Sequence, residues 1–329
     1  MPRHRASSRA ADRGRGSAGR REQGTVATEL TFPLVPRWRP VGSPFGRLHA
    51  NRRGVGSSVA GSRPYRPGDN PAAIDWKASA RVSSVRAEPE FIIREHFADE
   101  APRIVVVADR RPSMALYPEP WLDKPAALRA VWRLAAAAAL AELGLVGYLD
   151  SDEQAPPAWF PPSAGHALER VDEHLAQASF RGPDDSLDED FRYLVGVRRS
   201  LPPGTFVFVC SDYLSAPAPE WWARGLAYRW DVVPVVIQDP VWEQSFPRLD
   251  SLMVSFADPA TGRKRDVRLR RGESEIRRSQ NEARLALLLA DFRTLGLEPI
   301  VIDSAAESDV LRALTAWGET RLAVRKGAL

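Results

Sequence analysis

The sequence predicts an α/β fold, with a doubly wound and mostly parallel sheet flanked by helices. Apolar runs rich in valine, isoleucine and phenylalanine recur between residues 103 and 303, as expected for strands buried on both faces. Segments of helical composition separate these runs. Because strands that alternate with helices are joined by right-handed crossovers, this order favours parallel strands with helices on both faces of the sheet.

Five apolar runs are predicted to form the strands of this sheet. RIVVVAD (103–109) and TFVFVCSD (205–212) are strongly apolar, and both end in an aspartate. The other three are LVGYLD (145–150), DVVPVVIQD (231–239) and EPIVID (298–303). Ahead of them, VRAEPEFIIREHF (85–97) predicts one strand or a pair of short strands.

Six segments are predicted to be helices. In residues 123–143, Asp123 supplies an N-cap, Pro125 lies in the first turn, and the alanines that follow suit close packing on a sheet. The other five are residues 165–178, 188–201, 220–229, 274–297 and 307–321. Residues 251–270 predict a small inserted β-hairpin that turns around Pro259–Gly262. Trp221 and Trp222 open one of the helices and are expected to serve packing.

Composition divides the chain into three parts. Residues 1–30 are of low complexity and are expected to form a disordered, arginine-rich tail. Residues 31–98, rich in proline, glycine and arginine, predict an extended N-terminal arm, and residues 99–329 predict the α/β domain. Residues 1–21 hold seven arginines against one aspartate, so the net charge of +4 belongs to the tail. We therefore expect no specific nucleic-acid binding by the folded body.

Several classes of protein are disfavoured by the composition. The single cysteine, Cys210, excludes an internal disulfide and a cysteine-based zinc cluster, and it lies in an apolar run that suits an inert core position. The longest apolar stretch, 131–146, is interrupted by Arg133 and Glu142, so we expect no transmembrane segment. The five histidines show no metal-binding spacing and no hydrolase motif occurs. We expect a cytoplasmic protein that is not an enzyme.

Two predicted strands deliver carboxylates to the edge of the sheet where α/β folds bind their ligands. Asp109 ends the first of them, Asp212 ends the later run, and Ser113 follows Asp109 by four residues. Carboxylate and hydroxyl oxygens are ligands for a hard cation such as Mg²⁺. These three residues are therefore the candidate cation site of the sequence.

This arrangement resembles the metal-ion-dependent adhesion site of von Willebrand factor type A domains, a Rossmann-like fold. In that pattern the first strand ends in Asp-x-Ser-x-Ser, and VVVADRRPSM matches it at Asp109 and Ser113, with Asp212 as the later aspartate. Arg111 stands where the middle serine is expected. A like charge at about 4 Å costs on the order of 4 kcal/mol at an effective dielectric near 20, so Arg111 disfavours Mg²⁺. Ser186 is the candidate for the ligand that the family takes from an intervening loop.

A second motif lies in the arm, in YRPGDNPAAIDWKASAR (65–81). It is similar to the signature of the bacterial family called domain of unknown function 58, and the resemblance extends over roughly residues 40–320. The matching residues are Tyr65, Arg66, Pro67, Gly68, Asp69, Asp75 and Trp76. The Pro-Gly pair predicts a turn, and Arg66, Lys77 and Arg81 are candidate ion-pair partners of the two aspartates. A turn that anchors the arm and a contact surface both remain open for this segment.

The resemblance implies a non-enzymatic adaptor that works with a MoxR-type AAA+ ATPase. The expected contact surface is a degenerate adhesion site, the loops that carry Asp109, Ser113 and Asp212. No cofactor is expected, since Arg111 disfavours Mg²⁺. The alternative is a Mg²⁺-dependent enzyme for phosphoryl transfer or hydrolysis that uses Asp109 and Asp212.

Overall fold

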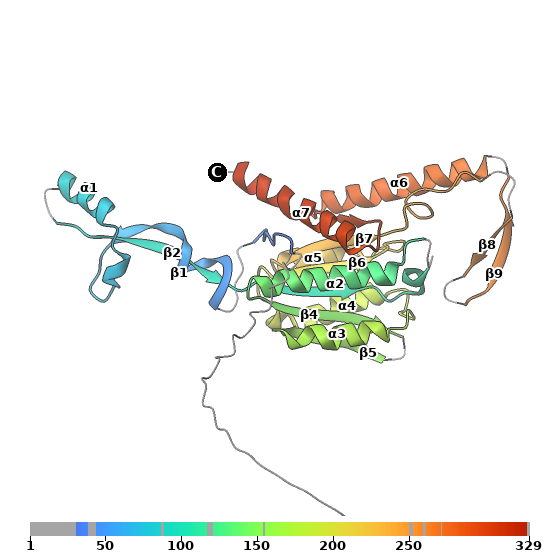
Figure 1. Cartoon of the computed structure of the whole chain (residues 1–329), viewed down its shortest axis with the longest axis horizontal. Helices are drawn as coiled ribbons and strands as arrows, with labels where there is room; N and C mark the ends of the chain where they lie inside the picture. Colours follow the sequence, from blue (N-terminus) through green and yellow to red (C-terminus); the bar gives the residue numbers. More distant parts are fainter. Residues whose placement is uncertain are drawn as a thin grey trace, which may run out of the picture.

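The computed structural model describes residues 31–38, 44–86, 89–116, 121–153, 155–249, 253–258, 261–270 and 272–327. They form an α/β domain from which a ribbon-like arm and a hairpin project at opposite ends (Figure 1). The predicted tail of residues 1–30 lies outside the described residues. None of the helices in the described part of the chain has the length and apolarity that a membrane crossing requires.

The centre of the domain is a six-stranded sheet with the strand order β10-β7-β6-β3-β4-β5. Five strands run parallel and β5 pairs antiparallel with β4. This confirms the predicted α/β, mostly parallel arrangement of a Rossmann-like fold. The strands are β3 (Arg103–Ala108), β4 (Leu145–Asp152), β5 (Ala155–Ser163), β6 (Phe206–Ser211), β7 (Asp231–Ile237) and β10 (Ile300–Ile302).

Strand β5 was missed by the sequence analysis because its sequence, APPAWFPPS, contains four prolines. Proline donates no backbone hydrogen bond, so such a segment reads as a loop. At the edge of a sheet one side of the strand needs no partner, which is where proline is tolerated. The pairing with β4 accordingly shows register shifts.

Helices cover both faces of the sheet. One face carries α2 (Lys124–Ala141), α3 (His166–Ala176) and α7 (Glu307–Gly327), and the other carries α4 (Ser186–Gly196), α5 (Pro219–Ala227) and α6 (Glu273–Thr294). Successive side chains of β3 from Ile104 to Ala108 enter the two layers alternately, so this part of the strand is apolar and buried throughout. Trp222 is 2 % exposed in the second layer, which confirms that the tryptophan pair serves packing. Burial raises the pKa of the Cys210 thiol far above its ordinary value.

The arm is an antiparallel ribbon of β1 (Pro44–Pro64) and β2 (Ile92–Glu100), joined through a 3₁₀ turn (Pro71–Ala73) and α1 (Trp76–Arg86). The strand predicted over 85–97 therefore begins later, because residues up to Arg86 continue helix α1. The hairpin predicted over 251–270 is present as β8 (Met253–Ala257) and β9 (Lys264–Arg268).

Residues 31–37 attach the start of the chain to the domain. Phe32 packs against Phe208 and Trp317 with ring centroids 6.4 and 6.2 Å away. The buried guanidinium of Arg321 donates to both carboxylate oxygens of Asp231, at 2.7 and 2.9 Å, and to the carbonyl of Val35 at 3.0 Å. Arg321 thus joins α7, the first residue of β7 and the N-terminal segment.

We expect Arg321→Ala to lower the free energy of unfolding by about 3 kcal/mol, because it leaves the buried Asp231 carboxylate without its cation. Chemical denaturation measures this loss. The control is Arg312→Ala, which removes an exposed pair with Asp309 and should cost less than about 1 kcal/mol. Equal effects of the two substitutions would contradict the role given to Arg321.

Candidate functional site at the carboxyl edge of the sheet

Asp109 and Asp212 lie at the carboxyl ends of two neighbouring strands. Asp109 directly follows β3 and Asp212 directly follows β6, its hydrogen-bonded neighbour. Both side chains are 0 % exposed. Two carboxylates this deeply buried need compensation by nearby cations or hydrogen-bond donors.

The compensation for Asp109 comes from Arg111, two residues later. The Arg111 Nε lies 3.0 and 2.9 Å from the two carboxylate oxygens of Asp109, and its Nη2 lies 2.6 Å from Oδ2. The backbone N–H of Arg111 also donates to Oδ1, at 2.9 Å. The same Nη2 is 3.9 Å from Asp212, so one guanidinium lies beside both aspartates.

The hydroxyl that completes this arrangement belongs to Ser211. Its Oγ donates to Asp109 at 2.6 Å and accepts from Arg111 at 3.2 Å. Burial alone would lower the pKa of Arg111, but the hydrogen bond to Asp109 and the charges of Asp109 and Asp212 raise it overall. Arg111 is therefore a permanent cation at the position between the two strand ends.

Asp212 has a second internal cation, Lys124, at the first position of α2. The Lys124 ammonium is 0 % exposed and lies 3.2 Å from Asp212 and 2.6 Å from Glu243. Burial raises the pKa of Glu243, while the charge of Lys124 opposes the shift. The other Glu243 oxygen accepts the backbone N–H of Asp239, which ties this cluster to the end of β7.

A parallel cluster surrounds Asp150 on strand β4. Its Oδ2 accepts from Arg110, from the Tyr148 hydroxyl at 2.8 Å, and lies 2.8 Å from His174 Nε2. Arg110 also bonds to the carbonyl of Ser179. Burial raises the pKa of Tyr148 well above its ordinary value. The loop that leads into α4 is thus held onto the strand ends by arginine.

Ser113 does not join the aspartates. It lies in a 3₁₀ turn (Pro112–Ala115) on the wall of a cavity of about 670 Å³, and no hydrogen bond among the described residues links it to Asp109 or Asp212. Arg111, Glu153, Asp184 and Leu214 line the same cavity. Arg111, which is paired with Asp109, thus contributes to the lining, and the other lining side chains include acids, the cation Arg181 and apolar groups.

Ser186 begins helix α4 and is 0 % exposed. Its Oγ has no hydrogen-bond partner among the described residues, and the same holds for Oδ2 of Asp190, one turn later. The other oxygen of Asp190 accepts from Ser151, and burial raises the pKa of Asp190 well above its ordinary value. The polar contact of α4 with β4 is therefore made by Asp190 and Ser151, and no hydrogen bond among the described residues joins Ser186 to Asp109 or Asp212.

The residues at this edge do not fit a resident divalent cation. Arg111 and Lys124 take the positions beside the two aspartates from which a metal would be coordinated. Within the described ranges, no group of three or more His, Cys, Asp or Glu side chains is arranged to hold a metal ion.

Sequence reasoning missed Ser211, Lys124 and Glu243. Each carried a signal, because each lies within a few residues of a predicted strand end or helix start. The signal could not be used without knowing which loops converge. Glu243, for example, reaches Lys124 across 119 positions of the chain.

The arm motif forms its own network, with partners other than those predicted. Asp69 makes a two-pronged pair with Arg63, with both distances 2.7 Å, and accepts the backbone N–H of Arg66. The bond to Arg63 and the one from the Arg66 backbone lower the pKa of Asp69 to about 2. Gly68 has φ of +100°, a conformation that favours glycine in this turn.

Asp75 opens helix α1 by accepting the backbone N–H of Ala78 at 3.0 Å, and it pairs with Arg94 across the ribbon. The direct ion pairs are therefore made by Arg63 and Arg94, and of the three predicted partners Arg66 contributes to Asp69 through its backbone N–H and its charge. The cause is the ribbon, which brings Arg63 and Arg94 to the motif from outside its sequence. Trp76 is 65 % exposed.

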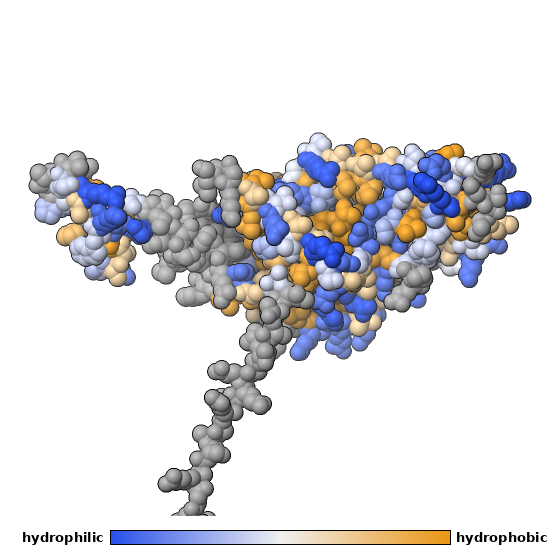
Figure 2. Space-filling model, turned by 45° about the horizontal axis from the view of Figure 1, so that its top comes forward, coloured by the Kyte–Doolittle hydropathy of each residue, from blue (hydrophilic) through white to orange (hydrophobic). Residues whose placement is uncertain are grey.

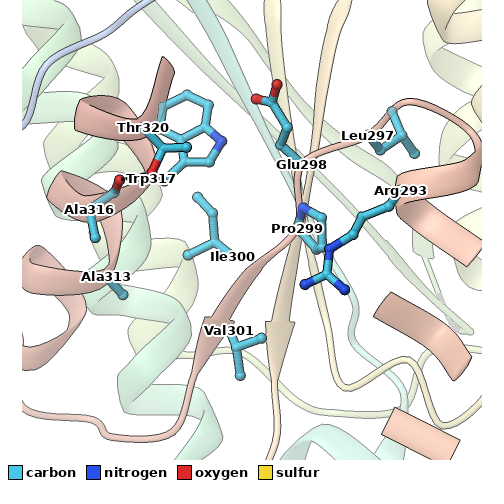
Figure 3. Close-up of a pocket in the computed structure, with 10 residues that line it drawn as sticks. All are labelled: Arg293, Leu297, Glu298, Pro299, Ile300, Val301, Ala313, Ala316, Trp317 and Thr320. Atoms are coloured by element: carbon cyan, nitrogen blue, oxygen red, sulfur yellow. Dashed lines mark hydrogen bonds between the residues drawn. The ribbon is translucent and has the colours of Figure 1, made fainter. Parts of the chain in front are cut away.

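Another hollow, of about 500 Å³, lies between α6, β10 and α7 (Figure 3). Its walls are mainly apolar, with Ile300, Val301 and Trp317 among them. Its one carboxylate, Glu298, is paired with Arg37 and Arg321. The hollow offers no reactive group, so the carboxyl edge is the better candidate site.

The structure defines an α/β protein whose strand-end aspartates are paired with cations of the same chain. Residues 61–286 match the family described as "Protein of unknown function DUF58", and the chain belongs to this family. The resemblance seen in the YRPGD segment is thereby confirmed. No curated protein matches the sequence.

Solved structures with low identity also align with the chain. BatB from Bacteroides thetaiotaomicron shares 13% identity with a TM-score of 0.40, covering 66% of this chain and 99% of that one. An aerotolerance-related membrane protein from Bacteroides fragilis shares 12% identity with a TM-score of 0.41, covering 67% and 99%.

The raised pKa of Asp190 predicts a pH-dependent stability. The folded protein keeps a proton that the unfolded chain releases above about pH 4, so this group lowers stability by about 1.4 kcal/mol per pH unit until its folded pKa is reached. Asp190→Asn removes this loss, so its stability relative to the wild type should rise as the pH increases above about 4. Denaturant titrations at several pH values measure the trend.

The control for this experiment is Asp185→Asn, which changes an exposed aspartate that makes no capping hydrogen bond at the start of the same helix. Its stability relative to the wild type should stay flat over the same pH range. A flat profile for Asp190→Asn as well would show that Asp190 is ionised in the folded protein.

Proposed function

We propose that the protein is a non-enzymatic adaptor that binds a MoxR-type AAA+ ATPase through the carboxyl edge of its sheet. The observation that carries this proposal is the neutralisation of Asp109 by Arg111 and of Asp212 by Lys124. With its cations supplied internally, this edge keeps its shape without a metal and presents a fixed surface. Because an AAA+ partner needs ATP, which the cytoplasm contains, this proposal places the protein in the cytoplasm.

In this proposal the edge is a degenerate adhesion site of a von Willebrand factor type A-like domain. The strand order with one antiparallel edge strand is consistent with such a domain. Asp109, Ser113 and Asp212 stand at the matching positions of the sequence, and the guanidinium of Arg111 replaces the cation. A partner that binds there contacts protein groups in place of a metal ion.

The shape of the edge supports a protein ligand. The cavity of about 670 Å³ is concave, and Leu214 on its wall is 38 % exposed. Arg111 and Asp109 below it are held by hydrogen bonds, so little conformational entropy is lost when a partner binds.

The alternative, a Mg²⁺-dependent enzyme, requires a cation between Asp109 and Asp212. Arg111 would have to leave a buried position in which its guanidinium bonds to both oxygens of Asp109. Removing one partner from such a buried pair costs about 3–5 kcal/mol, which metal binding would first have to supply. The adaptor role does not require that Arg111 leave Asp109.

Binding to a purified MoxR-type AAA+ ATPase from the same organism tests the proposal. Leu214→Arg places a charge in the cavity and should weaken binding at least tenfold, as measured by surface plasmon resonance. Met253→Arg is the matched control, because Met253 is an exposed apolar residue of the distant hairpin, and it should bind like the wild type. Wild-type binding no stronger than to an unrelated AAA+ protein would refute the adaptor role.

A further inference from the structure

The tip of the arm carries an aromatic pair that is exposed among the residues that the structure describes. Trp76 is 65 % exposed and Phe91 is 45 % exposed, and their rings meet edge to face with centroids 5.8 Å apart. Helix α1, which begins with Trp76, lies at the far end of the projecting arm (Figure 1). Aromatic side chains presented in this way are typical anchors of protein interfaces.

The tip is held in a defined conformation. The pairs Arg63–Asp69 and Arg94–Asp75 fix the turn and the start of α1, and the Ser79 hydroxyl accepts the backbone N–H of Ile92 at 2.8 Å. A two-stranded ribbon is marginally stable alone. Such reinforcement of a projecting tip suits a rigid docking element, which loses little entropy when it binds.

The arm and the domain carry opposite charges. Residues 31–98 contain eleven arginines and lysines against five acids, whereas residues 99–329 contain 28 against 34. The surplus is therefore +6 on the arm and −6 on the domain. At the tip, Arg66, Lys77 and Arg81 are exposed near Trp76, and Figure 2 shows hydrophilic and apolar side chains together at the end of the arm.

A surface complementary to the tip lies at the carboxyl edge of the domain. Three exposed acids lie there, with Glu153 and Asp184 lining the cavity and Asp185 next to them. Arg181 is an exposed cation of the same lining, and Arg111 is paired with Asp109, so the exposed acids outnumber the unneutralised cations. Phe180 and Leu214 supply apolar wall, so this edge suits a ligand that combines an aromatic ring with basic side chains.

The arm cannot reach the cavity of its own chain. Strand β2 ends at Glu100 and β3 begins at Arg103, so the arm leaves the domain at the amino ends of the strands. The cavity lies at their carboxyl ends. Because arm and cavity lie at opposite ends of the strands, reciprocal contacts between two copies require that the copies lie antiparallel.

We propose that the arm tip of one copy docks in the carboxyl-edge cavity of a second copy, with reciprocal contacts in a two-fold symmetric dimer. A two-fold axis satisfies both contacts at once and closes the assembly. The inference rests on the proposed function, since it names a second copy of the chain as an occupant of the same protein-binding edge. Partner ATPase and arm tip then compete for that edge.

Sedimentation velocity of the full-length protein alone tests this proposal. The wild type should sediment as a dimer, with a dissociation constant that rises steeply with salt. Trp76→Ala should raise that constant at least tenfold. Met253→Ala, a truncation of an equally exposed apolar residue away from arm and cavity, should leave it unchanged.

Charge reversal separates the proposed contact from a general loss of folding. A variant with Lys77→Glu and Arg81→Glu, and another with Glu153→Lys and Asp184→Lys, should each be monomeric. Mixing the two variants should restore a dimer. In the mixed dimer the acidic arm of the first variant meets the basic cavity of the second variant, and the natural arm of the second variant meets the natural cavity of the first. A monomeric wild type, or a dimer indifferent to all of these substitutions, would overturn the proposal.

The ATPase is absent from this experiment, so its outcome is independent of the adaptor role. A monomer that still binds the ATPase overturns the dimer alone. If the wild type is a dimer and the monomeric Lys77→Glu and Arg81→Glu variant, in which no arm tip occupies the edge, fails to bind the ATPase, the adaptor role alone is overturned.

Discussion

The buried ion pair between Arg111 and Asp109 determines the character of the carboxyl edge. An isolated carboxylate at 0 % exposure would be too costly to keep ionised, and the guanidinium compensates it through both oxygens. Lys124 compensates the charge of Asp212 through a bond to its Oδ2. Since each carboxylate already has its cation, the edge where this fold commonly holds a ligand is completed by the protein itself, and its geometry is fixed before any partner arrives.

Sequence alone predicted the fold well because the strands of a parallel sheet must be apolar throughout. The same logic brought Asp109 and Asp212 together, since each ends a strand and the two strands are neighbours. It failed where a residue's role depends on the tertiary structure. Prolines hid the edge strand β5, and Ser211 took the place at Asp109 that the motif suggested for Ser113. The partners of the arm motif, Arg63 and Arg94, came from ribbon pairing that no local pattern reveals.

The family motif and the carboxyl edge lie at opposite ends of the molecule, but their charges are of opposite sign and both expose apolar side chains. The arm has a surplus of positive charge and an exposed aromatic pair, whereas the domain has a surplus of negative charge, and Glu153 and Asp184 are among the residues that line its carboxyl-edge cavity. In both places, buried or half-buried arginine–aspartate pairs hold loops in one conformation. Arginine suits this task because its planar guanidinium binds a carboxylate through two bonds and stays charged. Rigid surfaces of opposite charge are what selective protein association requires.

The proposed role of Arg111, as a replacement for a cation at this edge, can be tested by calorimetric titration of the wild-type protein and of Arg111→Ser with MgCl₂. We expect no saturable heat from the wild type at millimolar metal. We expect measurable binding by Arg111→Ser, which removes the guanidinium and offers a hydroxyl beside Asp109. Saturable Mg²⁺ binding by the wild type would contradict this role, because the metal and Arg111 cannot occupy the same position.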